Sequence, residues 1–306
     1  MKLTVSSSPH IYSTDTTRGI MADVLIALLP AALAGILTFG VKAALILVVC
    51  VVSAVLAEYL WCLIVKKPIT VGDFSAAVTG LILGLCLSSA LPLWMAALGS
   101  AIAVIIVKQF FGGLGQNFAN PAATARIILL VSFPTYMSVY YEPFGEIVSS
   151  ATPLVNGQTP LKALLLGGHA GCIGEGFPLL LLIGGLYLMT RRVILPTIPV
   201  SYILSAFLLT FALTGDLYSA VYSILSGGII LAAFFMATDY TTSPKAFLSQ
   251  LIFGIGCGVL TVLIRHFGSM PEGVSYAILL MNILVPHINT LTAPKPFGYK
   301  EGRKNA

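Results

Sequence analysis

Residues 20–65 read IMADVLIALLPAALAGILTFGVKAALILVVCVVSAVLAEYLWCLIV, and this stretch decides the fold. It is about twice as long as the roughly 20 apolar residues that cross a bilayer as one helix. Lys42 lies between its two apolar parts, which begin near Ile20 and Ala43. The sequence therefore predicts two membrane-spanning helices joined by a short turn.

The composition extends this prediction to the whole chain. Hydrophobic residues make up 58% of the 306 residues and charged residues only 9%, whereas a soluble domain carries roughly 25% charged residues. The net charge is +5, but the basic residues lie at the ends of apolar runs and not in patches with interleaved aromatic residues. Membrane topology explains this arrangement, so nucleic acid is not an expected partner and the lipid bilayer is.

Ten apolar runs in the sequence are long enough to be considered as spanning helices. We therefore predict an all-α polytopic membrane protein in which residues 1–306 form one integral membrane domain. The runs begin near Ile20, Ala43, Ala76, Leu93, Ala122, Phe177, Val193, Tyr218, Phe247 and Ser275.

The basic residues predict the orientation of these helices. With ten spans, 12 of the 16 Lys and Arg residues fall on the side of the N-terminus. The opposite side holds Lys42, Lys162 and Arg265, and Arg126 falls inside the fifth run. Because cytoplasmic loops carry the excess of Lys and Arg, both termini are predicted to be cytoplasmic.

Five spans in each half predict an inverted repeat. The first half covers residues 1–134 and the second covers 177–306, and an odd unit that is duplicated must insert the second time with opposite orientation. Each half has a small-x-x-x-small pattern, Gly80/Gly84 and Gly228/Ala232, which lets helix backbones approach closely. The connection 135–176 leaves the fifth span and is predicted to be extracytoplasmic.

This outer connection contains the sharpest local motif, Ser149-Ser150-Ala151-Thr152-Pro153-Leu154. A threonine hydroxyl can be esterified to a phosphate, and Pro153 biases Thr152 toward an extended backbone that presents the hydroxyl. The alternative is purely structural, in which the hydroxyl groups form a local turn or cap the next helix.

The motif resembles the covalent flavin site of the RnfD/NqrB family, and other segments agree with that family over nearly the whole chain. The length is closer to RnfD than to the longer NqrB. The segments that carry the resemblance are Ser8-Pro9-His10 before Arg18-Gly-Ile-Met21, Gly80 to Leu87, Gln116-Asn-Phe-Ala-Asn120-Pro121-Ala, and Phe234-Phe-Met-Ala-Thr238-Asp239.

The resemblance implies a redox role in the cytoplasmic (inner) membrane of a bacterium. Thr152 would carry FMN through its phosphate, installed from FAD by a separate flavin transferase on the outer face, and some family members also hold a non-covalent riboflavin. The chain would be one subunit of an Rnf complex that couples electron transfer between ferredoxin and NAD to Na+ or H+ translocation. Other membrane and peripheral subunits of that complex would be its partners.

Arg126 in the fifth run and Asn120 just before it are further candidates for binding the flavin. Arg126 could face the flavin phosphate or the reduced ring, since an intramembrane Arg needs a partner; alternatively, it snorkels to the interface. Asn120 precedes Pro121 and could cap the helix, whose N-terminus favours anions.

Three acidic residues are candidates for an ion pathway. Glu58 lies deep in the second run, Asp23 near the start of the first, and Asp239 at the cytoplasmic end of the eighth. A buried carboxylate in a membrane is by default a candidate for ion handling. No metal site is predicted, because the five cysteines and four histidines lack ligand spacing.

Two other functional classes stay open on the sequence alone. A secondary transporter also has inverted repeats, interrupted helices and few buried charges, but no flavin. A membrane scaffold would hold redox partners without carrying electrons. Covalent flavin separates both alternatives from the redox subunit.

Overall fold

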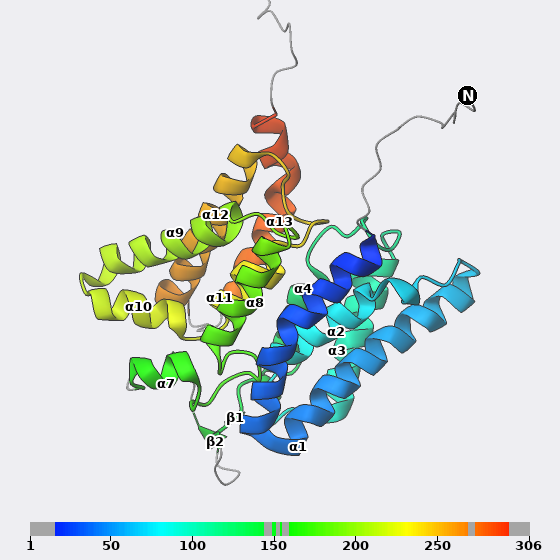
Figure 1. Cartoon of the computed structure of the whole chain (residues 1–306), viewed down its shortest axis with the longest axis horizontal. Helices are drawn as coiled ribbons and strands as arrows, with labels where there is room; N and C mark the ends of the chain where they lie inside the picture. The colour runs from blue at the N-terminus through cyan, green and yellow to red at the C-terminus, as the bar shows by residue number, and fades with distance from the viewer. Residues whose placement is uncertain (1–15, 144–148, 151–153, 155–158, 269–272, 294–306) are drawn as a thin grey trace, which may run out of the picture.

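A computed structural model describes residues 16–143, 149–150, 154, 159–268 and 273–293, and these are mostly helical (Figure 1). The elements in chain order are α1 (Thr17–Val65), η1 (Val71–Asp73), α2 (Ser75–Leu85), α3 (Leu93–Ile102), the π-helical η2 (Ala103–Gln109), α4 (Pro121–Ser132), α5 (Pro134–Met137), β1 (Tyr140–Tyr141), β2 (Ser149–Ser150), α7 (Leu161–Leu166), α8 (Pro178–Thr190), α9 (Thr197–Thr214), α10 (Leu217–Leu225), α11 (Ile229–Leu231), the π-helical η3 (Ala232–Met236), α12 (Phe247–Phe267) and α13 (Val274–Leu291).

The stretch that opens the sequence forms α1, which consists of two helical arms. Gly40 has φ 72° and ψ −158°, which breaks the helix, and the chain turns back there to give the hairpin that the sequence predicts (Figure 1). Thr16 caps the N-terminus, accepting a hydrogen bond from the Gly19 amide at 3.1 Å. Lys66 ends the second arm in a left-handed conformation.

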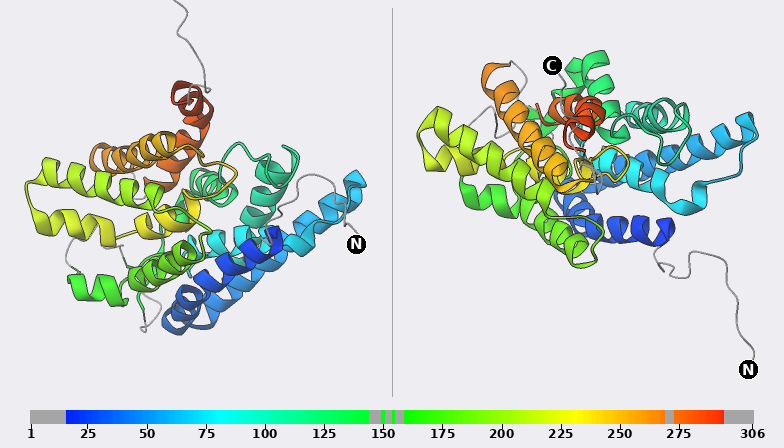
Figure 2. Two further views of the ribbon diagram at one scale, coloured as in Figure 1. Left: turned by 45° about the horizontal axis from the view of Figure 1, so that its top comes forward. Right: turned by 90° about the horizontal axis from the view of Figure 1, so that it is seen from above.

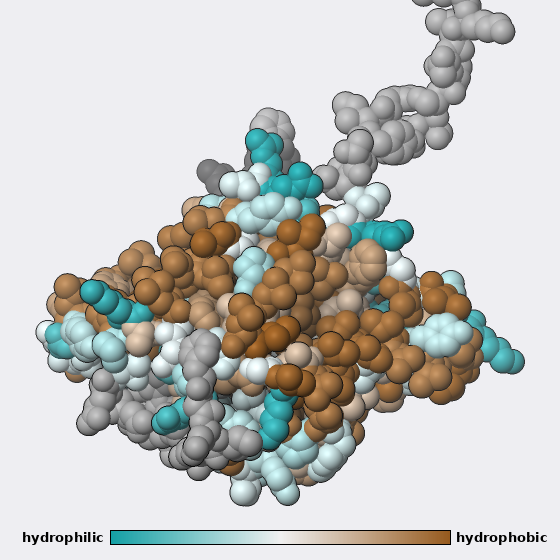
Figure 3. All heavy atoms as spheres, turned by 60° about the horizontal axis from the view of Figure 1, so that its bottom comes forward, coloured by the Kyte–Doolittle hydropathy of each residue, from teal (hydrophilic) through white to brown (hydrophobic). Residues whose placement is uncertain are grey.

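Within the described residues, four helices are long and apolar enough to cross a membrane, namely α1, α9, α12 and α13. A fifth candidate is the pair formed by α10 and the continuous segment α11–η3, bent by 64° at their junction. The remaining predicted apolar runs coincide with the shorter apolar helices α2, α3–η2, α4 and α8. The surface agrees with a membrane location, because apolar residues cover a wide band of the molecule from left to right in Figure 3.

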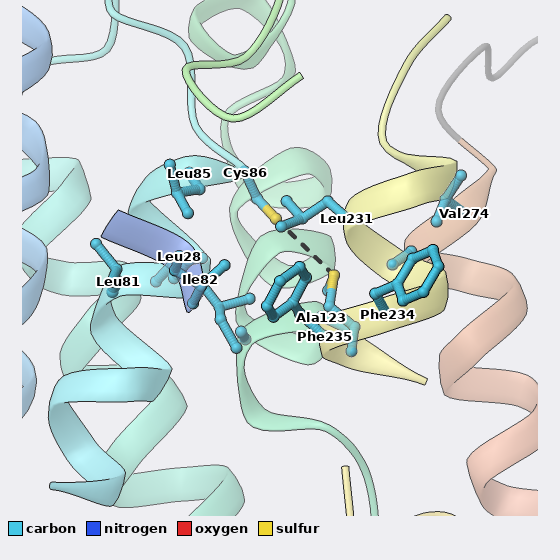
Figure 4. Packing of buried hydrophobic residues seen from close by; sticks show 14 of the residues in the cluster. Leu28, Leu81, Ile82, Leu85, Cys86, Ala123, Leu231, Phe234, Phe235 and Val274 are labelled. Carbon is cyan, nitrogen blue, oxygen red and sulfur yellow. Dashed lines mark hydrogen bonds between the residues drawn. The ribbon is translucent and has the colours of Figure 1, made fainter. Parts of the chain in front are cut away.

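The core forms where short helices of the two halves meet. Every residue of α2 except Ala77 is buried, and a methyl group on Gly80 would lie 2.6 Å from the Cys50 carbonyl oxygen of α1. The close approach predicted from Gly80 and Gly84 is therefore confirmed. Side chains of α2, α4, η3 and α13 pack together in this centre, with Cys86 Sγ 3.9 Å from Met236 Sδ (Figure 4).

The connection 135–176 is only partly outside the helical bundle. Its strands pair antiparallel, with Tyr140 opposite Ser150, and α7 follows. Its last residues return into the core, where the amides of Ile173 and Gly174 donate to the Leu87 and Leu85 carbonyl oxygens at 3.0 and 2.8 Å. α2 ends at Leu85, so the carbonyl groups of Leu85 and of the turn that follows accept these hydrogen bonds from the connection, and this part of the connection is buried.

The ends of the described chain lie toward one end of the molecule. In Figure 1 the start of α1 and the end of α13 point upward, whereas β1, β2 and α7 lie at the bottom. Figure 2 shows the same elements from two further directions, with the α9–α10–α12 group on one side and α1 to α3 on the other. Two groups of helices thus flank a shared centre.

Candidate functional site

The last residue of the predicted flavin motif, Leu154, lies beside a broken helix. Thr152, Ala151 and Pro153 fall outside the described residues; Ser149 and Ser150 form β2. Leu154 is described, and its Cδ1 atom lies 2.8 Å from the point where a Cβ on Gly227 would be. The end of the motif therefore contacts the junction between α10 and α11.

Arg265 of α12 holds this junction together. Its Nη1 donates to the Ser223 carbonyl oxygen at 2.6 Å, and Nη2 donates to the Ser226 carbonyl oxygen at 3.2 Å. A cation favours the negative C-terminal end of α10, and Gly227 allows the turn with φ 71°. The sequence predicts Arg265 only as a charge on the outer side. Two features of the sequence could have indicated this contact: a basic residue at the end of an apolar run, and the Gly227-Gly228 pair that interrupts another run.

Arg126 lies on the other side of the same junction and is buried. Its Nη2 is 3.6 Å from Glu175 Oε1 and 3.2 Å from Cys172 Sγ. The alternative in which Arg126 snorkels to the interface is wrong, because the guanidinium meets a carboxylate inside the protein. Glu175 Oε1 also lies 3.2 Å from the Cβ position of Gly228, at the start of α11, where a negative charge is favourable.

A second locus is a cavity of about 240 Å³ toward the end of the molecule that holds the start of α1. Its wall combines aromatic rings with polar side chains, an arrangement typical of ligand pockets. The Oδ1 atom of Asn117 is buried there without a hydrogen-bond partner among the described residues. Residues that line the cavity include Lys108, Asn117, Asn120, Phe234, Phe235 and Asp239.

Asn120 joins the two halves at this cavity. Its Oδ1 accepts from the Ala123 amide at 3.0 Å, so the predicted cap of α4 is confirmed. Its Nδ2 donates to the Met236 carbonyl oxygen at 3.0 Å. One side chain thus provides hydrogen bonds to a backbone amide at the start of α4 and to a backbone carbonyl group at the end of η3.

Asp239 is half-buried in the loop after η3. Burial raises the pKa of its carboxyl group, while hydrogen bonds from Thr241 and Thr242 act in the opposite direction. The Thr241 hydroxyl donates to Asp239 Oδ2 at 2.8 Å and the Thr242 hydroxyl at 3.2 Å. The Asp239 carboxylate therefore lines the cavity and is bound by the hydroxyl groups of two threonines.

Glu58 is fully buried and belongs to a polar network next to the cavity. Lys108 Nζ lies 3.0 Å from both of its carboxylate oxygens. The Thr70 hydroxyl and the Gln109 amide donate to Glu58 Oε1 at 2.7 and 2.9 Å. Lys108 is one of the 12 basic residues that the sequence assigns to the side of the N-terminus, and the structure buries its side chain in the bundle, where it pairs with Glu58.

Asp23 is separate from both loci. Its Oδ1 accepts from the Tyr187 hydroxyl at 2.8 Å, and its Oδ2 lies 3.2 Å from Arg191 Nε, whose side chain is 60% exposed. The pair joins α1 to α8 near the surface.

The structure therefore divides the predicted site residues between two places. It brings Asn120 and Asp239 to one cavity. Glu58 does not line that cavity but contacts Lys108, which does. Arg126 and Leu154 lie at the opposite junction.

Comparison with known proteins gives full-length matches. The family model described as "NQR2, RnfD, RnfE family" matches residues 4–298. The chain is 45% identical to the D-type subunit of the Na+-translocating ferredoxin:NAD+ oxidoreductase complex of Acetobacterium woodii, covering 100% of this chain and 98% of that protein.

Two further relatives carry related names. The D-type subunit of the proton-translocating ferredoxin:NAD+ oxidoreductase complex of Clostridium ljungdahlii is 41% identical over 96% of each chain. The D-type subunit of the ion-translocating oxidoreductase complex of Yersinia enterocolitica is 33% identical over 98% of this chain and 99% of its own. With its motifs, its helical architecture and these matches along its whole length, the chain belongs to the NQR2, RnfD, RnfE family.

Proposed function

We propose that this chain is the flavin-carrying D-type subunit of an Rnf-type complex that couples electron transfer between ferredoxin and NAD to ion translocation. The observation that carries the proposal is the 45% identity along the full chain to a subunit with that activity in its name. Relatives named for Na+ and for protons are similarly close, at 45% and 41%. Identity alone therefore does not select the ion.

The proposed topology has ten spans in two inverted halves. α1 supplies two spans through its turn at Gly40, and α2, α3–η2 and α4 supply three shorter ones. The second half supplies α8, α9, the broken α10–α11–η3 segment, α12 and α13. The location of the described chain ends opposite β1, β2 and α7 supports an even number of spans (Figure 1). Both termini are cytoplasmic in this proposal, and the Thr152 segment faces the outside of the inner membrane.

The proposed cofactor is FMN esterified to Thr152. A flavin transferase breaks the pyrophosphate bond of FAD, the threonine oxygen forms a new bond to the FMN phosphorus, and AMP leaves with the hydroxyl proton passing to a base. Bound FMN would supply one- or two-electron transfer, and the protein supplies position and charge. Arg265 places positive charge near Leu154, two residues after Thr152, which suits a phosphate diester, whereas the charge of Arg126 on the other side of the junction is paired with Glu175.

The cavity between the halves is the proposed site of a second, non-covalent flavin, riboflavin. Phe234 and Phe235 offer apolar ring surface, while Asn117 and Asn120 offer amide groups. The Oδ1 atom of Asn117 has no hydrogen-bond partner among the residues that the structure describes. An amide oxygen accepts a hydrogen bond from a ring N–H or a ribityl hydroxyl group. These residues would hold and orient the ring without a phosphate partner.

The proposed ion pathway uses the acidic residues on the side of the chain ends. Asp239 lines the cavity, and Glu58 contacts Lys108, which also lines it. Asp23 pairs with the partly exposed Arg191. We therefore propose that Asp23 attracts cations to the pathway without binding them directly. A buried carboxylate such as Glu58 in a membrane protein is by default a candidate for ion handling.

The decisive experiment measures flavin covalently bound to the chain after denaturation. The purified complex is run in SDS, and the band of this subunit is tested for flavin fluorescence and intact mass. Wild-type protein and Thr152→Ser should retain the fluorescence, because both have a hydroxyl group to esterify, whereas Thr152→Ala should lose it. A secondary transporter gives no fluorescent band, and a scaffold keeps its electron-transfer activity in Thr152→Ala. An unmodified Thr152 peptide from the native complex would refute the proposal.

A further inference from the structure

Lys108 lies between a buried carboxylate and the cavity. Its ammonium group is within 3.0 Å of both Glu58 oxygens and 2.6 Å of Ser75 Oγ. The same side chain, together with Ser75, lines the cavity. Three oxygen atoms from α1 and α2 thus surround one positive charge on η2.

The oxygen atoms around the ammonium group are those that an alkali cation prefers. Hard cations take carboxylate, hydroxyl and carbonyl oxygen ligands, and the group that occupies this position is itself a monovalent cation. The Ser75 hydroxyl donates to Asp73 Oδ1 at 2.5 Å, so its lone pairs remain for a cation. Glu58 and Asp73 bring two negative charges to the cluster, and Lys108 brings one positive charge.

We infer that Lys108 is a tethered counter-ion that occupies the cation site of Glu58, and that a free monovalent cation binds there when the ammonium group moves away. The flexible four-carbon stem of lysine allows such a movement. The cavity offers the ammonium a second location, because Lys108 lines it together with Asp239. Extra negative charge on a ligand in the cavity would attract the ammonium group away from Glu58 and leave the cation site there vacant for a free cation.

This arrangement links the charge of the cavity to the occupancy of the ion site. It rests on the proposed function, since a cation that is translocated must reach Glu58. The role of Lys108 is positional, because it acts through Glu58 and touches no reacting atom. Buried charges are strongly penalised without a partner, so a charged Glu58 requires either Lys108 or a cation that replaces it.

The test is the effect of alkali cations on the thermal unfolding of the purified full-length chain. Lys108→Ala leaves room for a cation, and its Tm should be low in choline chloride and rise in NaCl or LiCl at equal ionic strength. At a cation concentration of about 100 times Kd, the rise should be about 5 °C. Wild-type protein should show no such rise. The exposed Lys67 is the matched control, and Lys67→Ala should behave as wild type.

Further variants keep the inference open to refutation. Glu58→Gln/Lys108→Ala has no buried carboxylate and should lose the cation response. If Lys108→Ala does not accumulate, Lys108→Gln retains a donor to Glu58 and should show a smaller rise. A folded Lys108→Ala or Lys108→Gln protein with the same Tm in NaCl, LiCl, KCl and choline chloride would overturn the inference, as would a response that survives in the double variant. Covalent flavin is measured on the same samples, so failure of the proposed function is seen separately.

Discussion

The side chain of Asn120 links the two halves of the molecule, since its Nδ2 donates to the Met236 carbonyl oxygen at 3.0 Å while its Oδ1 caps α4. The capped helix belongs to the first half and the carbonyl belongs to η3 of the second. Both contacts are buried. The centre of the protein therefore depends on one amide group with two roles.

Substitutions at Asn120 should separate these roles. Asn120→Asp keeps the oxygen that caps α4 but places a second oxygen against the Met236 carbonyl, so we expect a loss of about 1–3 kcal/mol in the free energy of unfolding. Asn120→Ala also loses the cap, which is worth about 1 kcal/mol. Unfolding of the purified chain in detergent measures both values. Equal stability of Asn120→Asp and wild type would show that the link to Met236 contributes nothing.

Gly80 should not tolerate a side chain. A methyl group there would lie 2.6 Å from the Cys50 carbonyl oxygen and 2.9 Å from Val51 Cα, and backbone atoms cannot move aside cheaply. We expect Gly80→Ala to lower the free energy of unfolding by about 1–3 kcal/mol. In the part of the chain that the structure describes, no heavy atom lies within 4 Å of the Cβ position of Gly72, so Gly72→Ala is the control and should be near neutral in the same assay.

The ion pair between Asp23 and Arg191 should contribute little to stability. The Arg191 side chain is 60% exposed, so solvent screens its contact with Asp23 Oδ2. We expect Arg191→Ala to change the free energy of unfolding by less than about 1 kcal/mol. The free energies of unfolding of wild type and Arg191→Ala are compared at low and high salt. If the ion pair causes the difference, the difference should shrink as ionic strength rises. A loss similar to that of Asn120→Ala would contradict it.

Asp216 should make the stability of α10 depend on acid pH. Hydrogen bonds from the Ser219 hydroxyl and amide lower the pKa of this exposed carboxyl group below its ordinary value of 3.8. The folded state therefore favours the charged form, whose contribution is complete above the unfolded pKa and lost as pH falls through the lowered one. Wild type should exceed Asp216→Ala in Tm at about pH 7, and the difference should shrink below about pH 4. A difference that is constant over this range would exclude the carboxylate as its cause.

Several features of the site could not be predicted from the sequence because they depend on contacts between distant segments. The sequence identifies Arg126 as a charge that needs a partner, but the partner, Glu175, comes from a returning segment of a predicted outer loop. Arg265 lies 42 residues from Ser223, whose carbonyl it binds. The cavity is formed by α1, α2, α4 and η3 together, and no single segment encodes it.

The sequence by itself determined the apolar helices, the close packing at Gly80 and the cap at Asn120, because hydropathy, glycine and capping act over a few neighbouring residues. Only the tertiary structure decided that Lys108 is buried against Glu58 and that the segment around Ile173 enters the core. A lysine at the end of an apolar run has the same local pattern whether it faces water or a carboxylate from another helix. The free energy of burying a charge is settled by the partner that the fold brings to it.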